Sequence, residues 1–125
     1  MADYTPVYGR PTTMTLTAGA TITGGDVLVF SAADTVVPSA VNPANYAGIA
    51  AHDAVSGAPV TVYMGAGIIH ETAVAGATSA DVLLYAGAAG KITSTIGTGF
   101  GAVAVGVSLR ATAGAGTLRW KALLG

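Results

Sequence analysis

The sequence predicts an all-β fold, a small β-barrel or sandwich built from two similar halves and preceded by an extended N-terminal arm. Three observations support this prediction. Apolar and polar residues alternate in several short segments, Gly-rich stretches separate those segments, and the motif at residues 18–30 returns at residues 75–85. No uncapped periodic stretch reaches helical length, so strands are the favoured elements.

Several segments show the period of two that is typical of half-buried strands. They are TMTLT (13–17), VTVYM (60–64), KITST (91–95) and TLRWK (117–121). The continuous apolar runs in DVLVF (26–30) and DVLLY (81–85) indicate strands covered on both faces. Between the strands lie SAAD, SGAP, GAAGK and AGAG, which are typical of short turns. Many short strands joined by such turns indicate a sandwich or a barrel.

The repeat extends beyond one motif. AGAT occurs at 18–21 and 75–78, SGAPVTVYM (56–64) matches AGAGTLRWK (113–121) at the same spacing, and AGIAA (47–51) pairs with VGVSL (105–109) one residue out of step. Ala and Gly are abundant enough for AGAT to recur by chance, but Asp-Val-Leu and an aromatic residue follow both copies. We therefore expect pseudo-repeat halves at about 18–72 and 75–124 that close one common apolar core.

Charge and cysteine content exclude several classes of function. Charged residues make up 9% of the chain and the net charge is -1, so no basic field attracts nucleic acid or a membrane, and we expect neither as a partner. The absence of cysteine excludes disulfides and thiolate chemistry. Neither a signal-peptide core nor an apolar run of 18 residues is present, so we expect synthesis in a cytoplasm.

The first twelve residues differ from the rest and predict an extended arm, followed by a single β domain at 13–125. Prolines favour an extended backbone there, and tyrosines offer large apolar surfaces that become ordered on a partner. The C-terminus ends in apolar residues that we expect to pack on a neighbour or beneath the arm. Trp120 alternates with the apolar face of its strand, so the core is its expected place and an interface is the alternative. The candidate residues for contacts with a partner or a second protomer are Tyr4, Pro6, Tyr8, Arg10, Pro11, Trp120, Leu123 and Leu124.

No catalytic set is recognisable. There is no G-x-S-x-G motif, and the pairs His52-Asp53 and His70-Glu71 are adjacent, so on strands their side chains point to opposite faces. A metal site that uses both histidines and a carboxylate is conceivable, but the spacing matches no zinc motif. Asp26 and Asp81 are expected to accept backbone N–H groups in the turns before the two buried runs. We expect no enzyme, no cofactor, no catalytic residue and no bound metal.

The order of these motifs resembles the small capsid cement, or decoration, proteins of tailed bacteriophages. The likeness extends from about Thr15 to Leu123 and includes ITGGDVLVF, YAGIAAHDAVSGAPVTVYMGAGIIHET and AVGVSLRATAGAGTLRWKAL. Ser79-Ala80 departs from the family, which tends to have a second Gly before Asp81. The resemblance implies a β-rich homotrimer, made in the host cytoplasm, that sits on the outer capsid surface of the virion. There it would clamp adjacent major capsid protein subunits and stabilise the expanded shell. The extended arm predicted from the residues agrees with this role, because it is able to add a strand to the edge of a capsid protein.

Another class of function stays open at this point. A carbohydrate- or receptor-binding β module on a virion surface would present a cluster of exposed aromatic residues. The residues available for such a cluster are Tyr46, Tyr63, Tyr85 and Trp120.

Overall fold

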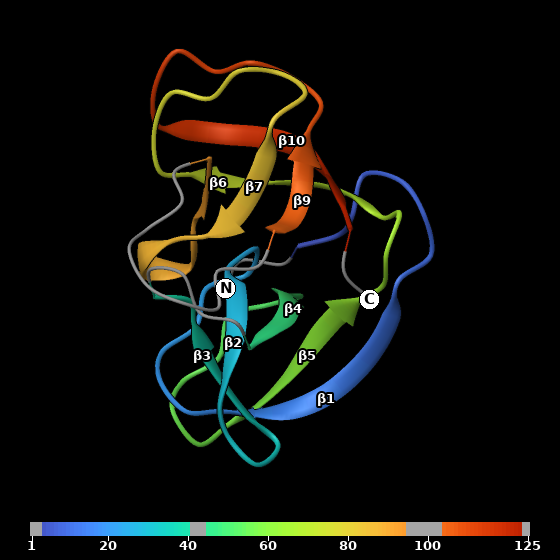
Figure 1. Cartoon of the computed structure of the whole chain (residues 1–125). Coiled ribbons are helices and arrows are strands. Elements are labelled where there is room, and N and C mark those ends of the chain that lie inside the picture. The colour runs from blue at the N-terminus through green and yellow to red at the C-terminus, as the bar shows by residue number, and fades with distance from the viewer. Residues whose placement is uncertain (1–3, 41–44, 95–103, 124–125) are drawn as a thin grey trace.

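The computed structural model describes residues 4–40, 45–94 and 104–123, and its strands form two closed five-stranded barrels (Figure 1). The order of strands is β1-β3-β2-β4-β5 in the first barrel and β10-β6-β8-β7-β9 in the second. The first contains β1 (Thr12–Ala18), β2 (Val27–Ala32), β3 (Thr35–Pro38), β4 (Tyr46–Ala50) and β5 (Pro59–Met64). The second contains β6 (Ile69–Val74), β7 (Leu83–Ala86), β8 (Ile92–Thr93), β9 (Ala104–Ser108) and β10 (Gly116–Ala122). The all-β prediction with two similar halves is confirmed.

The two barrels repeat the same pairing scheme, strand for strand. In each, the first and last strands pair antiparallel, as β1 with β5 and β6 with β10. In each, the first strand also meets the third in parallel, as β1 with β3 and β6 with β8, which closes the barrel. The repeated motif AGAT therefore lies in the turn after the first strand of each barrel. The sequences of β1 and β6 are unlike, so the repeat does not indicate that β6 is the counterpart of β1. The predicted first half, about 18–72, therefore includes most of β6, whereas in the structure β6 is the first strand of the second barrel.

Each barrel has its own apolar core, which differs from the one common core expected from the sequence. Leu16, Leu28 and Val60 belong to the cluster inside the first barrel. Leu84, Leu118 and Trp120 belong to the second cluster, which also takes in residues contributed by the first barrel, Val27 and Ile49. Short twisted strands curl each half into closure by itself, so the halves share a seam rather than a sealed interior.

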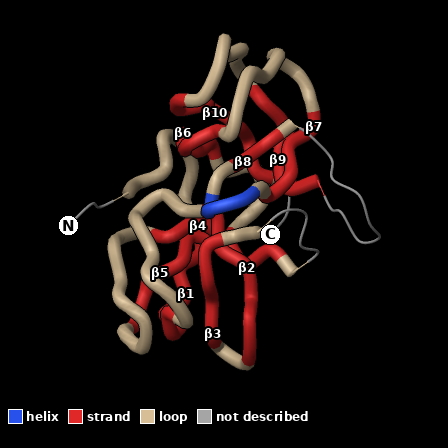
Figure 2. The backbone as a smooth tube through the Cα atoms, turned by 90° about the vertical axis from the view of Figure 1, so that its left-hand side faces the viewer, coloured by secondary structure: helices blue, strands red, loops and turns tan. Residues whose placement is uncertain are grey.

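The seam between the barrels includes a short 3-10 helix, η1 (Ala88–Gly90), which occupies the GAAGK turn (Figure 2). The hydroxyl of Ser39, beside β3, donates to Gly87 O at 2.6 Å. Gly90 N–H donates back to Ser39 O at 3.1 Å. Ser39 is buried, so these bonds satisfy polar groups that water does not reach. Among the described residues, no helix is long and apolar enough to cross a membrane.

Two equivalent glycines explain the repeated G-I-A and G-V-S motifs. A Cβ added to Gly48 in β4 would overlap Tyr63 O of β5, and one added to Gly106 in β9 would overlap the ring of Trp120 in β10. Each barrel therefore brings its fourth strand against its last one at a distance that only glycine permits. The motif is a packing requirement of the barrel, present once in each half.

The turns before β2 and β7 are held by different side chains, although the sequence places an aspartate in each. Asp26 Oδ2 accepts the N–H of Thr23 at 2.9 Å, as expected from the sequence. In the second turn, the Ser108 hydroxyl takes over this role, because it accepts from Val82 N–H at 3.1 Å and donates to Ser79 O at 2.6 Å. Asp81 instead stands at a positive φ of 65°.

Candidate functional site

Residues 4–8 form a strap that runs along the molecule and bonds to both barrels. Tyr4 N–H donates to Ala51 O, just after β4 in the first barrel, at 2.7 Å. Val7 N–H donates to Ile69 O at the start of β6 in the second barrel, at 2.8 Å, and Ile69 N–H donates to Tyr8 O at 3.1 Å. Tyr8 and Ile69 thus form an antiparallel bridge. The strap satisfies free backbone groups at the edge of β6.

The Tyr4 side chain enters the seam and ends on His70. Its hydroxyl lies 2.7 Å from His70 Nδ1 and accepts the N–H of Glu71 at 3.3 Å. The phenol oxygen accepts from Glu71 and keeps its O–H as a donor, so we assign that O–H to Nδ1, which corresponds to a neutral His70 with its proton on Nε2. The Tyr4 ring stacks on His70 at a centroid distance of 5.8 Å and meets Tyr63 edge-on at 6.0 Å.

His70 also contacts the core of the second barrel. Its ring lies 4.9 Å from that of Trp120, and Trp120 Nε1–H donates to the Thr72 hydroxyl at 2.9 Å. His70 is only 2% exposed, and burial lowers the pKa of its imidazole to about 4. Burial likewise raises the pKa of the Tyr4 phenol. Both groups are therefore uncharged at neutral pH, as their apolar surroundings require.

Beyond Tyr4, the strap leads to a group of exposed side chains. Tyr8 is 64% exposed, Leu123 is 43% exposed, and Arg10 is also exposed. These residues lie on neighbouring segments, because Gly9 packs on Ile68, whose carbonyl accepts the N–H of Ala122. We call Tyr8, Arg10 and Leu123 the strap surface. It offers apolar area and one cation on a frame held by backbone bonds, which is an arrangement suited to binding a protein.

A family model described as phage cement protein matches residues 8–124. The chain belongs to the phage cement protein family. The resemblance seen in the sequence is thereby confirmed, and with it a structural role at the phage head and a place on the virion capsid.

The fold of this cement protein is also found in a solved structure. It is similar to the crystal structure described as head fiber gp8.5 N base in bacteriophage phi29, with a TM-score of 0.69 and 15% sequence identity. The alignment covers 90% of this chain and 94% of that chain. At such low identity the likeness shows the fold alone. Comparison with curated proteins gives no match.

The residues predicted to contact a partner fall into different environments in the cement protein. Tyr8, Arg10 and Leu123 are exposed, Pro6 and Pro11 are half-buried beside them, and Leu124 lies outside the described residues. Two of the predicted residues are engaged within their own chain. Tyr4 is bonded to both barrels, so the strap is docked where the sequence suggested a loose arm.

Trp120 requires a correction as an interface residue. Its side chain is 0% exposed and fills the core of the second barrel, because β10 turns this face inward between β6 and β9. The core, which was the expected place of Trp120, is therefore confirmed, and the interface alternative is wrong. The sequence reasoning missed that His70 receives the strap. A signal for this contact is present in the sequence. His70 alternates with Thr72 and Val74 on the inward face of a strand, and a buried imidazole there needs a polar partner.

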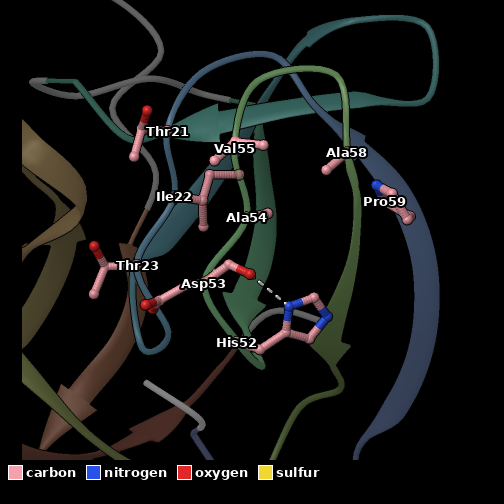
Figure 3. A pocket seen from close by; sticks show the side chains of 9 residues that line it. All are labelled: Thr21, Ile22, Thr23, His52, Asp53, Ala54, Val55, Ala58 and Pro59. Atoms are coloured by element: carbon pink, nitrogen blue, oxygen red, sulfur yellow. Dashed lines mark hydrogen bonds between the residues drawn. The ribbon is translucent and has the colours of Figure 1, made fainter. Parts of the chain in front are cut away.

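The cement protein also has a cavity of about 680 Å³ on its first barrel, lined by residues 21–23, 52–55, 58 and 59 (Figure 3). His52 faces it but has both ring nitrogens engaged. Thr61 N–H donates to Nε2 at 3.2 Å, so Nδ1 carries the proton and donates to Asp53 O at 2.8 Å. Asp53 Oδ1 accepts Gly24 N–H at 2.9 Å. These bonds are structural, and they leave the histidine no free lone pair for a ligand.

The hypothesis of a metal site formed by both histidines finds no support in the described part of the chain. His52 belongs to the loop after β4 in the first barrel, whereas His70 lies in β6 of the second barrel beneath Tyr4. Within residues 4–40, 45–94 and 104–123, no cluster of three or more His, Asp or Glu side chains is placed to hold a metal ion.

Proposed function

We propose that this cement protein binds the outer surface of a phage head and clamps adjacent major capsid protein subunits, which stabilises the expanded shell. The observation that carries the proposal is the strap surface, where Tyr8, Arg10 and Leu123 are each exposed on neighbouring segments. A large aromatic side chain, an arginine and a leucine supply the kind of anchors that dominate protein interfaces. Charged residues make up only 9% of the chain, so docking on a capsid buries few ions, the groups that are most costly to desolvate.

The double attachment of the strap supports a clamp. Because the strap bonds to Ala51 of the first barrel and Ile69 of the second, an anchor at Tyr8 is rigid with respect to both. An anchor that is ordered before binding loses less conformational entropy when it docks.

We propose in addition that the protein acts as a homotrimer at three-fold positions of the shell. Three copies would engage several weak contacts at once, so that dissociation requires all of them to open together. A mass measurement in solution tests the free state, and a cryo-EM map of decorated heads tests the bound state. A map with single, separated copies would contradict the trimer without contradicting capsid binding.

Substitution within the strap surface tests capsid binding. We expect the double variant Tyr8→Ala with Leu123→Ala to lose at least tenfold in affinity for expanded heads in a co-sedimentation assay, with its thermal unfolding little changed. The matched control is Val55→Ala, which removes an equally exposed apolar side chain (68%) from the loop that lines the cavity. Undiminished binding by the double variant would refute the strap surface as the binding site.

No observation favours the carbohydrate- or receptor-binding alternative. Trp120 is buried, and Tyr46, Tyr63 and Tyr85 are each half-buried within strands. Among the described aromatic side chains, the exposed ones are Tyr8 and Phe30, which lie on the strap and within β2 of the first barrel. Stacking on a sugar requires aromatic faces that are gathered and open, and these residues do not provide them.

A further inference from the structure

The strap covers an edge that occurs twice in the fold. In β6, the backbone groups of Ile69 and Glu71 point away from β10 and are taken up by the strap. Val7 N–H and Ile69 O, Ile69 N–H and Tyr8 O, and Glu71 N–H and the Tyr4 hydroxyl form these pairs. The strap thus acts as a short extra strand, with the Tyr4 ring closing over His70.

The equivalent edge of the first barrel belongs to β1. Ala18 N–H donates to Ala58 O on the side of β5, whereas Thr17 N–H donates to Asp34 O on the opposite side. By the alternation of a strand, Thr13 and Thr15 point the same way as Thr17, away from β5. Among the described residues, none pairs with Thr13 or Thr15 on that side. We call the backbone groups of Thr13 and Thr15 the open β1 edge; Figure 1 shows β1 along the outer margin of the first barrel.

The side chains beside the two edges also differ, because one is covered and the other is exposed. His70 stands opposite Trp120 in the second barrel, and Met14 stands opposite Val62 at the matching place in the first. His70 is 2% exposed beneath the Tyr4 ring, but Met14 is 47% exposed although it shares the inward face with Leu16 and Ala18. The second barrel therefore has a cover at this position that the described part of the first barrel lacks.

We infer that the open β1 edge binds an extended segment of the capsid protein by strand addition, with a large apolar side chain of that segment covering Met14. This inference rests on the proposed function and names how the partner is held. The chemistry of the occupant follows from the strap, which shows what the matching edge accepts: an uncharged, extended segment with an aromatic side chain. The strap of the same chain is engaged on β6, and β1 itself carries no charge, so an uncharged segment of the partner fits.

Thr13→Pro tests this inference directly. Proline at this position removes an N–H that points away from β5, so it leaves the ladder with β5 intact and blocks an added strand. The matched control is Thr117→Pro in β10, which also carries an exposed threonine, at the position that corresponds to the native Pro59 of β5. Both variants are checked for a thermal unfolding transition like that of the unchanged protein.

The binding assay uses empty expanded heads of the phage that encodes this protein. We expect Thr13→Pro to bind at least tenfold more weakly than the unchanged protein, and Thr117→Pro to bind equally well. If the unchanged protein does not bind heads, the proposed function fails. If it binds and Thr13→Pro binds equally, the proposed function stands and the open β1 edge is overturned.

Hydrogen exchange gives a second readout, whose main comparison uses the unchanged protein. The amides of Thr13 and Thr15 should exchange rapidly in the free protein and become protected on heads. Rapid exchange in both states would overturn the inference. So would protection that appears in the free protein as its concentration rises and is abolished by Thr13→Pro, because two copies would then pair through β1.

Discussion

The Tyr4 hydroxyl lies 2.7 Å from Nδ1 of His70, and this bond fastens the fourth residue of the chain to the first strand of the second barrel. The same oxygen accepts the N–H of Glu71. One phenol thus satisfies two polar groups at a strand edge, while its ring covers a buried imidazole. The two hydrogen bonds depend on the hydroxyl of residue 4, and the stacking depends on its aromatic ring.

Replacing Tyr4 by Phe should lower the free energy of unfolding by about 1–3 kcal/mol, because it leaves His70 Nδ1 and Glu71 N–H without their partner. Urea denaturation followed by Trp120 fluorescence measures this. The matched control is Tyr8→Phe, whose hydroxyl is on an exposed side chain and whose effect should stay within about 0.5 kcal/mol. Equal effects of the two substitutions would contradict the role of the Tyr4 hydroxyl.

Stability should fall as the pH is lowered from about 6.5 to about 4. The folded pKa of His70 is lowered to about 4 by burial, against 6.5 for an ordinary histidine, so the unfolded chain binds a proton in this range that the folded chain does not. The loss attributable to His70 is at most about 3 kcal/mol, from about 1.4 kcal/mol for each unit of pKa. Denaturation at several pH values should show a flatter dependence for His70→Asn, whose amide oxygen can still accept from Tyr4. Identical slopes would exclude His70 as the source.

Alanine at either motif glycine should destabilise the barrel that contains it. Gly106→Ala forces a methyl group against the Trp120 ring, and Gly48→Ala forces one against Tyr63 O, so we expect losses of about 2 kcal/mol or more. The control is Gly116→Ala in β10, where nothing lies within 4 Å of the added Cβ. Thermal unfolding that is unchanged in all three variants would show that the strands can move apart freely.

The ion pair between Arg119 and Glu71 should contribute little. Its atoms lie 3.1 Å apart, but the side chains are 25% and 39% exposed, so solvent screens the attraction. Glu71→Gln should change the free energy of unfolding by less than about 1 kcal/mol. A larger loss, suppressed by salt, would indicate that the pair also holds the strap in place.

The architecture was predictable because it depends on local patterns that the sequence displays. Alternation in TMTLT, VTVYM and TLRWK marked β1, β5 and β10, and the two copies of Asp-Val-Leu marked β2 and β7. The closure of each half on itself was not predictable, because it depends on the parallel contacts of β1 with β3 and β6 with β8. These contacts join residues distant in sequence, and no residue pattern records which strand closes on which.

The candidate site was likewise predictable only in part. Tyr8 and Leu123, which the sequence indicates as partner-binding candidates, are both exposed. The docking of Tyr4 on His70 requires two residues 66 positions apart to meet, so the sequence does not predict it and indicates Tyr4 only as a contact to a partner. For Trp120 the sequence allows both the core and an interface. The orientation of β10, which turns this side chain toward the core, decides between them.

The two fastening points of the strap have a mechanical consequence. Ala51 and Ile69 lie in different barrels, so tension applied at the start of the chain is divided between both rather than peeling one strand from one barrel. A load on residues 4–8 would act on these backbone bonds in shear, so that several of them resist together. Residues 4–8 would then serve as a tether that distributes the load over both barrels.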